Sequence, residues 1–240
     1  MITLTNRNGR LGNHFFRAVA AHFIASESGI CVKYFRDFSE LGLELCRGTA
    51  DSVPKLNIDL SENYFENPQD YTELRGFNVS MMHLYCQSNY MSRKIIDFLK
   101  MNQDNIYANN PFNGRYRQNN EVFIHVRLGD VIDKNPGFDY YDKILSKLNF
   151  EKGYISSDSI NHPICNKLIM KYNLQVYGNE EIKTWQFAST CKYIILSNGT
   201  FSWIIGALGF FSNVWYPKIG KKWHGDIFHS DIWNEVDCGI

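Results

Sequence analysis

The sequence has little that would mark a metal centre or a nucleic-acid surface. Its six cysteines contain no Cys-x-x-Cys pair and its seven histidines no His-x-x-x-His spacing, which excludes a zinc framework built on paired ligands. No Asp-x-Asp sequence occurs either. The 25 basic and 25 acidic residues balance to a formal net charge of zero, so no basic stripe predicts binding to nucleic acid.

Long apolar runs are also missing. The longest, residues 201–211, is broken by Gly206 and Gly209 and falls short of the ~20 residues that cross a bilayer. Residues 1–6 lack a basic start followed by an apolar stretch, so no secretion signal is expected. These absences predict a soluble, cytoplasmic protein without a membrane span, whose cysteines are free thiols.

What the sequence does contain is enough apolar side chains for one large core or two modest ones, since 44% of its 240 residues are hydrophobic. A strand over 2–5, a helix over 14–26 and a strand over 30–35 are typical of the opening of a doubly wound α/β domain. Residues 37–69 show only a weak pattern of apolar and polar residues. Further strands are predicted at 81–85, 122–126, 153–156, 174–177, 193–197 and 214–216, and further helices at 90–101, 140–148, 162–172, 180–189 and 201–210.

The polar stretch over residues 109–120 is the predicted linker. It divides the chain into an N-terminal Rossmann-like domain at 1–118 and a C-terminal Rossmann-like domain at 119–240. Strands that alternate with helices favour parallel sheets with right-handed crossovers. The predicted fold class is therefore α/β, with two Rossmann-like domains facing a central cleft. A single larger sheet is the alternative.

Residues 122–130, Val-Phe-Ile-His-Val-Arg-Leu-Gly-Asp, carry the most informative chemistry. A buried strand here ends in a cation, a glycine and a carboxylate. Open α/β sheets bind ligands at the carboxyl ends of their strands. An arginine offers bidentate hydrogen bonds to phosphate oxygens and keeps its charge. The segment predicts a phosphate site at Arg127. The alternative is a salt bridge between Arg127 and Asp130 that only fixes the turn.

Three further polar groups fall at predicted strand-to-helix junctions: residues 9–13, 157–158 and 197–202. Such junctions point backbone N–H groups and a positive helix end at a bound ligand. Each group also has a plainer interpretation, as a tight turn or as a helix N-cap at Asn198 or Thr200. Residues 9–13 have neither the Gly-x-Gly-x-x-Gly spacing nor the Walker lysine, so a dinucleotide fingerprint and a P-loop are not supported.

Taken together and in order, these segments resemble the α-1,2-fucosyltransferase family, which carries a His-x-Arg-x-Gly-Asp element. Residues 125–130, His-Val-Arg-Leu-Gly-Asp, match that element. Similar segments precede and follow it, so the resemblance spans nearly the whole chain. The other four segments are 9–16 (Gly-Arg-Leu-Gly-Asn-His-Phe-Phe), 85–90 (Tyr-Cys-Gln-Ser-Asn-Tyr), 155–158 (Ile-Ser-Ser-Asp) and 197–203 (Ser-Asn-Gly-Thr-Phe-Ser-Trp).

The resemblance implies a GT-B architecture, with the nucleotide-sugar donor held mainly by the second domain and the acceptor by the first. It implies an inverting, metal-independent glycosyltransferase that moves fucose from GDP-fucose, its co-substrate, to a hydroxyl of a glycan acceptor, with no other cofactor. Arg127 would hold the diphosphate and stabilise the charge on the departing nucleotide. Asp130 is a candidate for the catalytic base, with turn stabilisation as the alternative. The implied donor-binding residues are His125, Arg127, Asp158, Asn198, Thr200, Ser202, Gly12 and Asn13.

The chain also departs from the family pattern. Leu128 stands where the family usually has a second arginine, Val131 replaces an aromatic residue, Ile204 replaces a tryptophan and His14 a glutamine. These departures leave two alternatives open: a different donor such as UDP-xylose, and a non-catalytic relative that binds a nucleotide sugar or glycan. The compact chain predicts a bacterial enzyme, or a viral one in the host cytosol.

Overall fold

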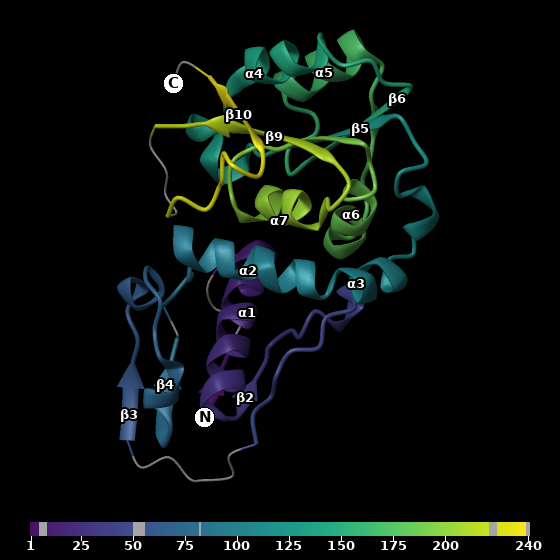
Figure 1. Cartoon of the computed structure of the whole chain (residues 1–240). Coiled ribbons are helices and arrows are strands. Elements are labelled where there is room, and N and C mark those ends of the chain that lie inside the picture. The colour runs from purple at the N-terminus through teal and green to yellow at the C-terminus, as the bar shows by residue number, and fades with distance from the viewer. Residues whose placement is uncertain (5–8, 50–55, 82, 221–224, 239–240) are drawn as a thin grey trace. The chain divides into compact units, whose positions relative to one another are not determined.

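The computed structural model describes residues 1–4, 9–49, 56–81, 83–220 and 225–238. The chain forms two compact units, each with a parallel sheet and helices, as Figure 1 shows. The predicted α/β class is therefore confirmed. The first unit comprises Met1–Ile106 and His224–Ile227, and the second comprises Tyr107–Trp223 and Phe228–Ile240.

The first unit holds a four-stranded parallel sheet in the order β2-β1-β4-β3. Its strands are two to four residues long. Residue 81 and residues 83–85 form a loop where a strand over 81–85 was predicted, so that prediction is wrong; residue 82 lies outside the described residues. The elements are β1 (Ile2–Thr3), α1 (Leu11–Ser28), β2 (Val32–Lys33), η1 (Ser39–Leu41), β3 (Leu56–Asp59), η2 (Glu62–Phe65), η3 (Tyr71–Leu74), β4 (Phe77–Ser80) and α2 (Asn89–Met101).

Helix α1 is the core of the first unit. Phe15 and Val19, one turn apart, are fully buried, as the helical spacing predicts. The helix ends at Gly29, whose φ of 75° is left-handed and whose N–H donates to the carbonyl of Ala25. Helix α2 is amphipathic and begins at Ser88, whose hydroxyl accepts from the N–H of Met91.

The second unit holds a six-stranded parallel sheet in the order β10-β9-β8-β5-β6-β7. Helices α4 and α5 cover one face and α6 and α7 the other, as Figure 1 shows. This is the arrangement that right-handed crossovers give when the direction of winding reverses. The elements are α3 (Gln103–Asn109, shared with the first unit), η4 (Asn113–Arg115), β5 (Glu121–Val126), η5 (Gly129–Lys134), α4 (Gly137–Leu145), β6 (Lys152–Ser157), α5 (Pro163–Tyr172), β7 (Gln175–Val176), α6 (Glu181–Ala188), β8 (Tyr193–Ile195), α7 (Thr200–Leu208), β9 (Asn213–Lys218) and β10 (Asn234–Asp237).

Strand β5 lies at the centre of this sheet, and all six of its residues are buried. A strand covered on both faces is expected to be apolar along its whole length, which is why this segment stands out in the sequence. Strand β10, at the edge, was not predicted because most of its residues are exposed and carry no apolar pattern. Its pairing with β9 holds it in the sheet.

The polar stretch 109–120 is not a linker, and that prediction is wrong. Asn110 is 3% exposed, and its amide donates to the Tyr116 hydroxyl at 2.8 Å and to the carbonyl of Gln186 at 2.9 Å. The polar side chains of this stretch therefore satisfy buried groups of the second unit. The two units divide between Ile106 and Tyr107. The domain limits 1–118 and 119–240 remain a prediction.

Candidate functional site

The strand order of the second unit creates a topological switch point. From β5 the chain winds outward to β6 and β7, and then returns to the other side of β5 for β8, β9 and β10. Open α/β sheets of this order bind ligands in the crevice at the carboxyl ends of the two strands where the winding reverses. Here those strands are β5, which ends at Val126, and β8, which ends at Ile195. The polar residues that follow them border the switch point.

Arg127 directly follows β5, and its side chain is 14% exposed. Its guanidinium forms ion pairs with two carboxylates, those of Asp130 and Asp158. Asn135 donates to the Arg127 carbonyl at 2.7 Å, which holds the backbone of the turn. The structure thus contains the salt bridge to Asp130 that the sequence offered as an alternative, and adds a second one. The phosphate role of Arg127 remains a prediction.

Asp158 follows β6 and ties two strand ends together. One of its carboxylate oxygens accepts the N–H of Leu128 at 2.9 Å, and the other pairs with Arg127. Its side chain is 22% exposed, whereas that of Asp130 is 62% exposed.

His125 and Ser202 connect β5 to α7 across the switch point. The Nδ1 atom of His125 lies 2.5 Å from the Ser202 hydroxyl, which also accepts the N–H of Ser197 at 3.0 Å. Both residues are buried, at 5% and 0% exposure. Burial, helped by the positive charge of Arg127, lowers the pKa of His125 to about 3, so its imidazole is neutral. Their predicted donor contacts remain untested.

This buried imidazole gives the fold a defined pH dependence. The unfolded chain protonates His125 near pH 6.5, whereas the folded chain does so only near its pKa of about 3. The unfolded state therefore binds the additional proton between these values, and stability falls as the pH is lowered. We expect the free energy of unfolding to lose about 2 kcal/mol from this residue between pH 7 and pH 5.

Urea unfolding at pH 7, 6 and 5 measures the effect by comparing the wild type with His125→Gln. Only the difference in pH slope matters, because the substitution itself changes stability at every pH. We expect the slope to be shallower in His125→Gln, whose amide does not titrate. Equal slopes in the two proteins would show that His125 is not the titrating group.

Helix α7 begins at the switch point. The N-cap is Gly199, which has no side chain, so the predicted cap at Asn198 or Thr200 is wrong. Instead, the side-chain carbonyl oxygen of Asn198 accepts the N–H of Gly199 at 3.0 Å, within a buried turn. Thr200, the first helical residue, is half-buried. A helix start of this kind carries a partial positive charge and N–H groups directed along the axis.

Gly12 and Asn13 belong to the first unit, at the start of α1, whereas the other predicted site residues belong to the second. The side-chain oxygen of Asn13 accepts a hydrogen bond from the Gln87 amide at 2.8 Å. The segments 9–16 and 85–90 therefore meet, although they are far apart in the sequence. In the loop before α1, a Cβ on Gly9 would lie 2.1 Å from the Asn13 amide nitrogen, so only glycine fits there.

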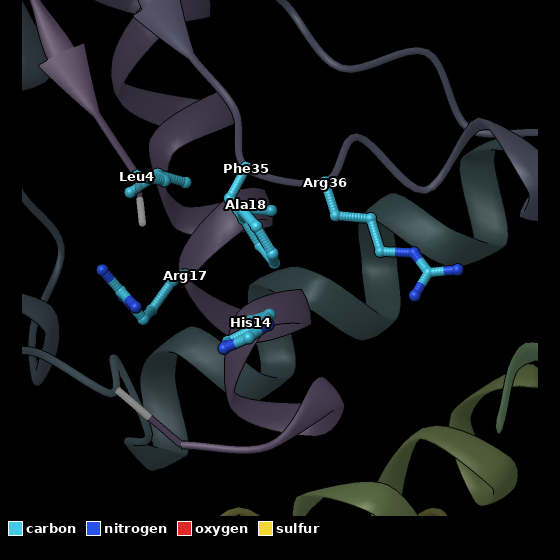
Figure 2. Close-up of a pocket in the computed structure, with 6 residues that line it drawn as sticks. All are labelled: Leu4, His14, Arg17, Ala18, Phe35 and Arg36. Atoms are coloured by element: carbon cyan, nitrogen blue, oxygen red, sulfur yellow. The ribbon is translucent and has the colours of Figure 1, made fainter. Parts of the chain in front are cut away.

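Sequence reasoning missed Arg17, a cation in the core of the first unit. The residue is 2% exposed, and its guanidinium donates to the Met81 carbonyl at 3.4 Å. Burial lowers its pKa below the ordinary value. Its signal in the sequence was a lone cation among apolar helix residues. A cavity of about 10 Å³, room for about one water, is lined by Leu4, His14, Arg17, Ala18, Phe35 and Arg36. Figure 2 shows these residues, with Arg36 extending away from Arg17.

Among residues 1–4, 9–49, 56–81, 83–220 and 225–238, no group of three His, Cys, Asp or Glu side chains could hold a metal ion. No helix in this described part of the chain is long and apolar enough to cross a membrane.

The second unit therefore has the topology of a doubly wound α/β sheet, with an arginine and a helix N-terminus at its switch point. No family model matches the chain, and no curated protein sequence matches it. Among solved structures, it is similar to the crystal structure of POFUT1 in complex with GDP-fucose, at 10% identity over 100% of this chain and 98% of that chain. The TM-score is 0.42, too low to establish a shared fold.

Proposed function

We propose that the chain is an inverting glycosyltransferase that transfers fucose from GDP-fucose to a hydroxyl of a glycan acceptor. One observation carries the proposal: Arg127 and the first turn of α7 border the same switch point, at β5 and β8. Sheets of this order bind nucleotides there, with phosphate at a helix N-terminus. The five ordered segments that resemble α-1,2-fucosyltransferases support the choice of sugar.

In this reaction, the acceptor oxygen attacks C1 of the fucose from the face opposite to the phosphate. The bond between C1 and the phosphate oxygen breaks, and its electron pair leaves with GDP. The proton of the acceptor hydroxyl passes to a base, for which Asp130 is the candidate. Arg127 and the N–H groups at the start of α7 stabilise the charge that builds on the departing diphosphate, so that the mechanism needs no metal ion.

The remaining residues take roles that follow from their surroundings. Thr200 and Asn198 are proposed to contact phosphate or sugar, because they lie at the start of α7. His125 and Ser202 contact each other, and we propose that they hold β5 and α7 together beneath the donor. The proposal includes a GT-B-like architecture, in which the first unit binds the acceptor and Gly12 and Asn13 reach the donor.

Binding of GDP is the direct test of the donor. A ligand that binds only the folded state stabilises it by about 2.7 kcal/mol at a concentration 100 times its Kd. We expect GDP to raise the Tm in a thermal-shift assay, with and without EDTA, and GMP to raise it less because it lacks the second phosphate. A shift with UDP but not GDP would contradict the guanine assignment. No shift with either nucleotide would contradict the nucleotide-sugar function.

A further inference from the structure

We propose that Asp158 is a positioning residue that holds Arg127 in place, and that Asp130 is an exchangeable partner whose position the donor diphosphate takes. The inference rests on the proposed function, because it concerns how the same arginine receives its ligand. It assigns opposite roles to two carboxylates that contact one guanidinium. One of them keeps the arginine in the orientation that binds phosphate, and the other competes with phosphate.

The first reason for this assignment is that both terminal nitrogens of the Arg127 guanidinium already have carboxylate partners. Its Nη1 atom pairs with Asp158 and its Nη2 atom pairs with Asp130. Arginine recognises phosphate through two parallel N–H donors on one edge of its plane. With a carboxylate on each terminal nitrogen, a diphosphate that approaches the guanidinium meets two negative charges, and it binds more favourably when one carboxylate leaves.

The surroundings of the two carboxylates decide which one leaves. The side chain of Asp158 is 22% exposed and its second oxygen accepts the N–H of Leu128, so this carboxylate is held from two sides. Asp130 is 62% exposed and lies in η5, where the backbone of Val131 departs from helical geometry. An exposed ion pair contributes little to stability and is replaced at low cost. Asp130 is therefore the partner that an anionic ligand displaces.

Gly129 is independent evidence that the pair of Arg127 with Asp158 is built into the turn. A Cβ at position 129 would lie 2.5 Å from the Oδ2 atom of Asp158 and 3.2 Å from the Nη1 atom of Arg127. These are the two atoms that form the ion pair. The glycine thus leaves the space that this pair occupies.

Two isosteric substitutions distinguish a positioning role of Asp158 from a purely electrostatic effect on GDP binding. Asp130→Asn and Asp158→Asn each remove one negative charge beside the proposed anion site. If charge alone mattered, both would tighten the binding of GDP. If Asp158 positions Arg127, Asp130→Asn tightens binding whereas Asp158→Asn weakens it. Asp158→Asn keeps an oxygen that can accept the Leu128 N–H, so the turn retains that hydrogen bond.

Isothermal titration calorimetry with GDP measures this difference in the full chain. We expect Asp130→Asn to lower the Kd about two- to fivefold, the range of an exposed ion pair. We expect Asp158→Asn, and Gly129→Ala as a second way to disturb the same pair, to raise it about tenfold or more through misplacement of the arginine. Tighter GDP binding in Asp158→Asn would overturn the positioning role. Weaker binding in Asp130→Asn would overturn the exchange.

A readout without nucleotide separates this inference from the proposed function. The NMR signals of the Arg127 guanidinium, assigned by their loss in Arg127→Lys, should be resolved in the wild type and in Asp130→Asn because the Asp158 pair slows rotation. They should merge in Asp158→Asn and Gly129→Ala. Unchanged signals in Asp158→Asn would overturn the positioning role. Failure of the wild type to bind any nucleoside diphosphate would instead overturn the proposed function, and with it the exchange at Asp130.

Discussion

Arg127→Ala is expected to lower turnover by about 10²- to 10³-fold, the effect of removing one group that stabilises charge in a transition state. The expected loss is in catalysis far more than in folding, because Arg127 lies at the end of β5 and outside the hydrophobic core. We also expect its removal to weaken GDP binding. Initial rates with GDP-fucose and an acceptor panel, together with urea unfolding, measure the two effects separately.

Two further variants serve as comparisons for Arg127→Ala. Arg127→Lys keeps the positive charge but loses the planar pair of donors, so we expect an intermediate rate. Arg117→Ala is the matched control, since Arg117 is an exposed arginine of the same unit that lies over the Phe211 ring, and its loss should leave turnover unchanged. If Arg127→Ala transferred sugar at the wild-type rate, the diphosphate role would be wrong.

Leu128→Arg is expected to abolish cooperative folding of the second unit. Leu128 is fully buried in a cluster formed by β5, β6, β8, α4 and α5, which also contains Val126, Tyr140 and Ile155. An isolated buried charge costs several kcal/mol, a large share of the ~5–15 kcal/mol that stabilises a typical domain. Circular dichroism during urea unfolding should therefore show a lost or strongly shifted transition.

Leu128→Met is the control for this substitution. A swap that conserves volume and polarity should cost less than about 1.5 kcal/mol. The comparison also tests the place of residue 128, where the resembled family usually has a second arginine. A Leu128→Arg protein with wild-type stability and tighter GDP binding would show that this side chain faces the site and not the core.

The resemblance aligns Leu128 with a second arginine of the family, but the structure places its side chain in the core. Successive side chains of an extended chain point to opposite sides. With Arg127 paired to carboxylates at the strand end, Leu128 turns into the core, while its N–H holds Asp158. A motif alignment compares residue types at each position and does not show which way each side chain points. It therefore marked position 128 as lacking an arginine, whereas the fold uses this position for a core residue.

Local patterns nevertheless predicted most elements of the second unit. The buried run of β5, the helical spacing of α5 and the glycine and proline positions are properties of neighbouring residues, and a single sequence displays them. The linker prediction failed because it depends on distant partners. The polar stretch at 109–120 was interpreted as a linker because its buried contacts, such as that of Asn110 with Gln186, come from elsewhere in the chain.

The sequence by itself therefore determined the α/β class and the position of Arg127 directly after a buried strand, because periodicity and strand exits are local. Only the tertiary structure decided that β8 lies beside β5, that His125 meets Ser202, and that Asp158 pairs with Arg127. Parallel strands are joined through helices, and so their order depends on which faces of the whole sheet become buried. No local pattern in the sequence shows the strand order, yet this order brings the residues of the candidate site together at one edge of the sheet.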